Sequence, residues 1–160
     1  DFLRYLIVYS LGGVYLDIKA TMSLSLNEIL LPTDRYILYH WDNESEGCYK
    51  GFGYHKDLPI EQFPYGEYPQ GFIFTAPGHP IIRAVLLQVL RNLDRYNPFT
   101  IGVGLRGVLR TTGPIAYSLA IERVTISRNG SEFYTKYFHF FFWSRWVLRI
   151  LCDKIRQRFQ

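Results

Sequence analysis

Asp17 combines an ionisable side chain with a position that suits ligand binding. It follows a short run of bulky apolar residues, Val14-Tyr15-Leu16, that is typical of a buried strand. In open α/β sheets, ligands bind beyond the carboxyl ends of the strands, where a polar side chain can point into a crevice. Tyr15 is in phase with Asp17 along this strand, so both side chains are expected on one face. Tyr15 would either line the ligand pocket there or pack in the core.

The residues before this strand predict the helix that positions it. Apolar side chains recur at helical spacing at Phe2, Leu3, Leu6, Ile7 and Leu11. Asp1 is placed as an N-cap whose carboxylate would accept the free amide protons of the first turn. Gly12-Gly13 supplies residues of positive φ on which helices end. The helix, the turn and the strand are expected to form half of a βαβ unit.

Three motifs in this order resemble one family of enzymes. The first joins Asp1-Phe-Leu-Arg-Tyr5 to Gly12-Gly-Val-Tyr-Leu-Asp17, the second is Gly71-Phe-Ile-Phe-Thr-Ala-Pro-Gly-His-Pro80, and the third is Arg110-Thr-Thr-Gly-Pro114. Together they resemble glycosyltransferase family 32, whose members carry a DXD-containing sugar-binding region and include mannosyltransferases and capsular polysaccharide enzymes. The resemblance spans residues 1–121, and no single motif carries it alone.

The resemblance implies a GT-A-type, Rossmann-like α/β fold and a glycosyltransferase activity. A sugar would pass from a UDP- or GDP-sugar donor to a hydroxyl of a glycan or lipid-linked acceptor, with retention of configuration. Asp17 is the catalytic residue that it implies. The candidate donor-binding residues are Asp1, Arg4, Tyr15, Asp17, Lys19, Gln70, Thr112 and Gly113.

Several of these residues also have a structural interpretation. Asp1 and Arg4 lie one helical turn apart and therefore share a face, but Asp1 could simply cap the helix and Arg4 could be a surface charge. Thr112 and Gly113 precede a proline that starts a predicted helix over residues 115–121, and a helix N-terminus attracts phosphate or sugar oxygens. Capping explains Thr112 equally well. Gln70 stands where family members often carry an asparagine.

The DXD motif departs from the family pattern, because Lys19 stands where the second aspartate would be. That aspartate usually binds Mn²⁺ or Mg²⁺, and an ammonium group has no lone pair to offer a divalent metal. Lys19 could itself balance the diphosphate charge. Asp17 could instead hold a metal with a distant ligand, for which the resemblance suggests His139. The third alternative is a non-catalytic sugar-binding or membrane-associated relative.

The chain divides into four segments within one glycosyltransferase region, residues 1–160. Residues 1–41 form the donor-site half and residues 42–70 a long ordered loop, which is either a lid that contacts the acceptor or an insertion without catalytic role. Residues 71–121 carry a strand and helices, including a helix that opens at His79-Pro80. The core stripe predicted for that helix is Ile81, Ile82, Val85, Leu86, Val89, Leu90 and Leu93, and His79 is expected to cap or pack rather than to catalyse.

The fourth segment, residues 122–160, carries most of the basic excess of the chain. Residues 121–160 hold 8 basic and 3 acidic residues, against 10 and 11 in residues 1–120, which accounts for the net charge of +4. The aromatic residues between them favour an anionic lipid surface or an anionic acceptor, or else a buried aromatic strand followed by a helix with a basic face. Nucleic acid is not an expected partner, because the remaining basic residues form no stripe with stacking aromatics.

Length and composition indicate one globular domain, with 160 residues of which 48% are hydrophobic. The chain starts inside a helix cap without a methionine, so we expect a piece of a longer protein that lacks the N-terminal part of the fold. Two cysteines are too few to indicate a disulfide framework. The compartment stays open: the resemblance implies the cytoplasmic face of a membrane for bacterial or viral members and the Golgi for eukaryotic ones.

Overall fold

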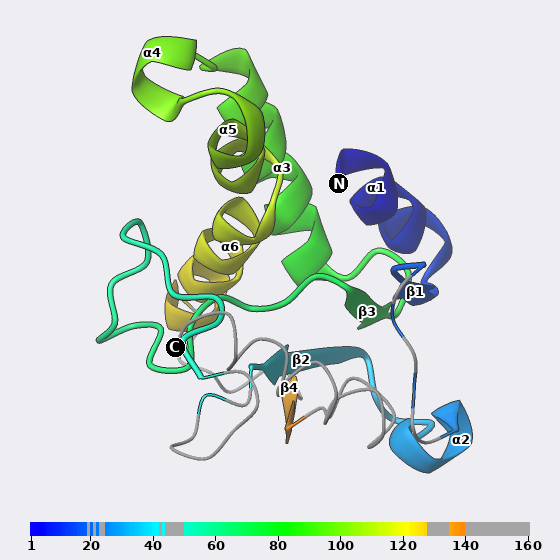
Figure 1. The fold of residues 1–160 in the computed structure, drawn as a ribbon. Helices are drawn as coiled ribbons and strands as arrows, with labels where there is room; N and C mark the ends of the chain where they lie inside the picture. The colour runs from blue at the N-terminus through cyan, green and yellow to red at the C-terminus, as the bar shows by residue number, and fades with distance from the viewer. Residues whose placement is uncertain are drawn as a thin grey trace.

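The structure is a computed structural model that describes residues 1–18, 20, 22, 25–41, 43, 50–127 and 135–139, and of residues 126–127 and 135–139 only the backbone. It shows a mixed α/β fold in which helices α1, α3 and α6 lie on one side of a four-stranded sheet (Figure 1). Lys19 and residues 140–160, most of the basic aromatic segment, lie outside the described residues.

The sheet is mixed, with the strand order β1-β3-β2-β4. Its strands are β1 (Gly13–Leu16), β2 (Tyr36–His40), β3 (Phe72–Thr75) and β4 (Thr135–His139). Strand β3 runs antiparallel to both β1 and β2, whereas β4 runs parallel to β2. Strands β1, β2 and β4 therefore point the same way, and their carboxyl ends lie at one edge of the sheet.

The expected βαβ unit stays a prediction, because among the described residues the one neighbour of β1 in the sheet is the antiparallel β3, which comes almost sixty residues later. Strand β1 is less buried than expected: Val14 and Tyr15 are partly covered and Leu16 is exposed. In the described part of the chain, β1 pairs on one side only, and an edge strand needs less apolar surface than a central one.

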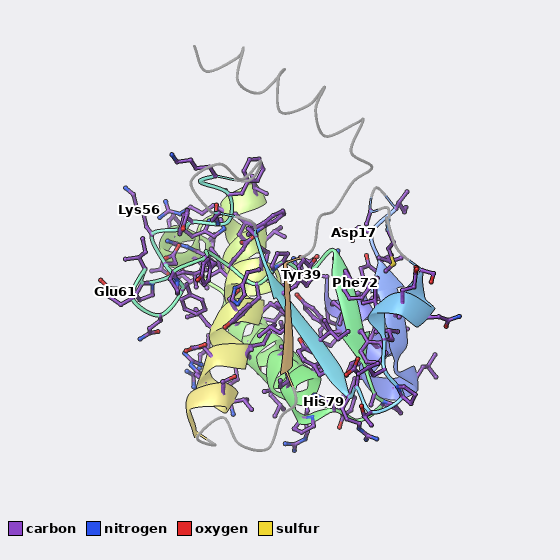
Figure 2. The ribbon with its side chains drawn as sticks, turned by 90° about the horizontal axis from the view of Figure 1, so that it is seen from below. Asp17, Tyr39, Lys56, Glu61, Phe72 and His79 are labelled. Atoms are coloured by element: carbon purple, nitrogen blue, oxygen red, sulfur yellow. The ribbon has the colours of Figure 1, made fainter. Side chains whose placement is uncertain are left out.

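The two faces of the sheet follow from the alternation of side chains along the strands. Tyr36, Leu38 and Ile73 face the helices and belong to the main core with residues of α1, α3 and α6. Ile37, Tyr39 and Phe72 point to the opposite face, where Ile29 of the short helix α2 (Leu26–Ile29) covers them. Figure 2 shows Tyr39 and Phe72 next to each other on neighbouring strands.

The predicted helices are present, with corrected extents. Helix α1 (Phe2–Leu11) is confirmed and ends at Gly12, which has a φ of 67° and packs so closely on Pro77 that a Cβ would lie 2.6 Å from the proline ring. Helix α6 (Pro114–Ser127) extends beyond the predicted residue 121. Two further helices, α4 (Pro98–Ile101) and α5 (Gly104–Thr111), lie within residues 71–121, which are expected to carry a strand and helices.

Helix α3 (Pro80–Asp94) begins as predicted, with Pro80 in its first turn. His79 caps it, because the His79 Nδ1 atom accepts a hydrogen bond of 3.3 Å from the Ile81 N–H group, so its structural role is confirmed. The predicted core stripe is buried as far as Val89 and wrong beyond it: Leu90 and Leu93 are 44% and 46% exposed. Figure 1 shows α3 running away from the sheet toward α4, so its last turns have less core to pack against.

The predicted long loop is confirmed for residue 43 and residues 50–70, which contain no helix or strand. It is packed rather than detached, since Leu58, Phe63 and Tyr68 are buried in the main core. The Tyr68 N–H group donates a hydrogen bond of 2.8 Å to the buried Ser118 hydroxyl of α6. Its role as a lid or acceptor contact stays a prediction.

Candidate functional site

Asp17 lies directly beyond the carboxyl end of β1. Its backbone N–H group donates a hydrogen bond of 2.8 Å to the Gly71 carbonyl at the start of β3, which continues the pairing of the two strands by one step. Figure 2 shows Asp17 at the opposite end of the sheet from His79. The Asp17 side chain is 44% exposed, so a ligand can reach its carboxylate.

Arg4 connects the helix to the strand end. Its guanidinium forms an ion pair of 2.9 Å with the Asp1 carboxylate, and its Nη1 atom donates hydrogen bonds of 3.0 Å to Asp17 Oδ1 and of 3.1 Å to the Gln70 carbonyl. The Arg4 side chain is only 17% exposed. These contacts confirm that Asp1 and Arg4 share a face and show that Arg4 is more than an ordinary surface charge.

Tyr15 supports the same carboxylate from the strand. Its hydroxyl donates a hydrogen bond of 2.7 Å to Asp17 Oδ1, which confirms that Tyr15 and Asp17 lie on one face. The Arg4 guanidinium lies over the Tyr15 ring, 4.7 Å from its centroid, in a cation–π contact. Burial and the hydrogen bond to Asp17 raise the pKa of Tyr15, so its hydroxyl remains a donor at neutral pH.

The Asp1 carboxylate does not cap α1 through its side chain, which corrects the expectation from the sequence. It accepts instead from Arg4 and from the Thr112 hydroxyl, at a distance of 3.2 Å. A charged guanidinium interacts more strongly with a carboxylate than the neutral amides of the first turn do. Thr112 thereby joins the cluster from the end of α5.

Gln70 also joins the cluster, although through a residue that the sequence analysis missed. The Tyr5 hydroxyl of α1 lies within hydrogen-bonding distance of Gln70 Oε1 and 3.0 Å from the Thr112 carbonyl oxygen. Tyr5 is fully buried and stacks on Tyr117, with ring centroids 5.6 Å apart. A tyrosine on the buried face of a helix needs a hydrogen-bond partner for its hydroxyl. This requirement was the sequence signal that could have identified Tyr5 as part of the cluster.

Gly113 is a packing residue in this structure. A Cβ on Gly113 would lie 2.8 Å from the Leu109 Cα atom, and the Gly113 N–H group donates 2.8 Å to the Val108 carbonyl. These contacts go to α5 and not to the cluster. A residue without a side chain is needed at this point because α5 and α6 turn tightly against each other.

The geometry gives little support to a metal site formed by Asp17 and His139. The backbone of His139, in β4, pairs with that of His40, in β2, and lies at the same edge of the sheet as Asp17. Two strands lie between β1 and β4, which corresponds to about 14 Å at the usual strand spacing. The His139 side chain is not described, and Lys19 lies outside the described residues. Among the described residues no group of three or more His, Cys, Asp or Glu side chains could hold a metal ion.

The cluster of Asp1, Arg4, Tyr15, Asp17, Gln70 and Thr112 is therefore a partly covered polar site at the carboxyl end of β1 and the amino end of β3 in a mixed α/β domain. Comparison with family models, curated proteins and solved structures gives no match for this chain. In the part of the chain that the structure describes, no helix is both long and apolar enough to cross a bilayer.

Proposed function

We propose that this chain is the donor-binding region of a glycosyltransferase similar to family 32, with a GT-A-type fold. It would transfer a sugar from a nucleoside diphosphate to a hydroxyl of a glycan or lipid-linked acceptor. The observation that carries the proposal is the contact of one guanidinium, that of Arg4, with both Asp1 and Asp17. These are the residues that the resemblance associates with the donor sugar.

The charges of the cluster suit a sugar better than a phosphate. Two carboxylates and one guanidinium leave an excess of negative charge, and carboxylate oxygens accept hydrogen bonds from sugar hydroxyls. Arg4 and Tyr15 both donate to the Oδ1 atom of Asp17, and within the described residues its Oδ2 atom makes no hydrogen bond. The Asp17 side chain is 44% exposed, and its Oδ2 atom is the acceptor that we assign to the donor sugar.

The diphosphate needs positive charge that this cluster does not supply. In the transfer, the bond between the anomeric carbon and the diphosphate oxygen breaks and its electron pair leaves with the diphosphate. A new bond forms between that carbon and the acceptor oxygen, whose proton passes to a base that we do not assign. Arg4 can offset part of the charge on the leaving group. Lys19 or a divalent metal ion held by Asp17 would supply the remainder.

Titration of the full-length protein with UDP- and GDP-sugars, with and without Mn²⁺, tests the proposal. Donor hydrolysis is followed in the same samples. Asp17→Asn keeps the size of the side chain but removes the charge, so donor binding is expected to weaken about tenfold to hundredfold, the worth of a charged hydrogen bond. Turnover should fall at least as much. Asp94→Asn is the matched control, because Asp94 is an exposed carboxylate at the end of α3.

Each outcome separates the alternatives. Binding that requires Mn²⁺ assigns the missing charge to a metal, and metal-independent binding that fails in Lys19→Ala assigns it to the lysine. Asp17→Asn with full turnover and an unchanged melting temperature would contradict the proposal. Binding of a sugar donor without any turnover would favour the non-catalytic relative.

A further inference from the structure

The segment that carries α4 and α5 exposes a group of large apolar side chains. Phe99 is 96% exposed and Leu105 is 75% exposed, and Val103 and Val108 are also exposed. We call these four residues the α4–α5 tip. Single exposed apolar residues are common, but several within ten residues form a surface that is costly to leave in water. Figure 1 shows α4 at one end of the molecule, beyond α5 and away from the sheet.

The backbone of the tip is held in place by specific contacts. Asn97 caps α4 by accepting a hydrogen bond of 2.9 Å from the Phe99 N–H group, and the Tyr96 hydroxyl donates 2.9 Å to the Gly102 carbonyl. A Cβ on Gly107 would lie 2.6 Å from that same carbonyl oxygen, so α5 packs directly on the turn. The apolar side chains are therefore displayed by an ordered backbone.

Three basic side chains near the tip have no acidic partner among the described residues. Arg91, Arg95 and Arg106 form no ion pair within the described part of the chain, and Asp94 is the one acidic residue of residues 91–110. Arg106 lies against the turn of the tip, since a Cβ on Gly102 would contact its side chain at 3.4 Å. This end of the molecule thus combines apolar surface with an excess of positive charge.

Two of these arginines also line a surface hollow at the base of α4. The hollow measures about 350 Å³ and is lined by Gln88, Arg91, Asn92, Arg95, Ile101 and Arg123. Ile101 belongs to α4, so the hollow adjoins the tip. Arg91 and Arg95 bring two guanidinium groups to the hollow, and no carboxylate lines it, which suits a phosphate group. The other polar lining groups are engaged, because Arg123 donates to Gln88 Oε1 and the two side-chain amides bond to each other and to carbonyl groups of α5.

We propose that the α4–α5 tip docks on a bilayer of anionic lipid, with Phe99 and Leu105 entering the interface and a lipid phosphate in the arginine hollow. Apolar side chains next to arginines match the acyl and headgroup layers of such a bilayer. A second copy of the chain fits less well, because two identical tips would bring their unpaired arginines together. The proposal does not depend on the proposed glycosyltransferase activity.

Sedimentation of the full-length protein with lipid vesicles tests this docking. Binding is expected to vesicles of phosphatidylcholine mixed with phosphatidylserine, to be weak with phosphatidylcholine alone, and to fall as salt is added. Phe99→Ser should lower the partition coefficient about tenfold, the worth of one buried phenylalanine. Arg91→Gln and Arg95→Gln should each lower it about fivefold, the worth of one basic residue at an anionic surface.

Two matched controls and a second measurement make the test decisive. Ile60→Ser removes an apolar residue that is 61% exposed in the long loop, and Arg83→Gln removes an exposed arginine from the other end of α3. Both should bind vesicles like the parent protein. If Phe99→Ser and Arg91→Gln also bind like the parent, the proposal is wrong and another surface carries any binding. If Phe99→Ser abolishes self-association in analytical ultracentrifugation and leaves vesicle binding unchanged, the tip is an interface between copies.

Discussion

At the scale of single residues, the geometry of the candidate site depends on the planar fork of Arg4. One nitrogen of its guanidinium serves Asp17 and the Gln70 carbonyl, and another serves Asp1. An ammonium group carries the same charge on a single nitrogen and cannot reach all three acceptors in the same plane. The charge and the geometry of Arg4 can therefore be separated by a conservative substitution.

Arg4→Lys is expected to lower the free energy of unfolding by about 2 kcal/mol, because hydrogen bonds to charged groups are lost in a site that is largely covered. Donor affinity should fall with it, since Asp17 loses the partner that orients its carboxylate. Urea denaturation and donor titration measure the two effects. Arg83→Lys, an exposed substitution of the same kind, should change neither. A variant with parental stability would show that Arg4 contributes only its charge.

At the scale of the elements, α3 depends on a cap that titrates. His79 is buried and stacks on Tyr36, with ring centroids 5.0 Å apart. Burial, together with the charge of Arg35, lowers the pKa of His79 from its ordinary value of 6.5 to about 4. The unfolded chain therefore takes up a proton near pH 6.5, whereas the folded protein takes it up only near pH 4. As the pH is lowered from 6.5 to 4, the free energy of unfolding decreases, because the unfolded state binds more protons than the folded state in this window.

His79→Asn tests this dependence, because asparagine is a good N-cap and does not titrate. Between pH 6.5 and pH 4 the parent should lose about 3 kcal/mol more of its free energy of unfolding than the variant, the equivalent of the lowered pKa. Denaturation curves at several pH values give the difference, in which the groups common to both proteins cancel. Parallel pH profiles would mean that His79 titrates normally.

At the scale of the whole molecule, the long loop completes the core from outside the regular elements. Tyr68 reaches α6 through its hydrogen bond to Ser118, and Asp57 forms an ion pair with Arg110 of α5 at 2.6 Å. The loop also holds the buried Glu67, whose pKa is raised by burial and whose carboxylate pairs with His55 at 2.6 Å. Its position thus depends on contacts with residues of α5 and α6 that lie 53 and 50 positions later in the sequence.

Ser118→Ala should release the loop more than it unfolds the protein. The buried Tyr68 N–H group would lose its acceptor, at a cost of about 1–3 kcal/mol. Trypsin cleavage after Lys56, which is exposed on the loop (Figure 2), should then become faster under native conditions. Ser10→Ala, an exposed substitution on α1, is the matched control. Cleavage at the parental rate would show that the other contacts suffice to hold the loop.

The features that the sequence determined by itself are those with local causes. The start of α3 at Pro80 and the end of α1 at Gly12 follow from residues within a few positions of one another. The same holds for part of the site: Asp1 and Arg4 are one helical turn apart, and the tight turn after α1 brings Asp17 back to them.

Only the tertiary structure decided the remaining features, because they depend on pairing between distant segments. Strand β3 inserts between β1 and β2, and a short apolar run such as β1 carries no signal for the partner that it will pair with. That pairing places Gln70 beside Asp17, and the packing of α5 brings Thr112 to Asp1. The arginine hollow likewise exists only because α3, α4 and α6 meet there. Periodicity shows which face of an element is apolar, but the neighbour of each face is chosen by the packing of the whole chain.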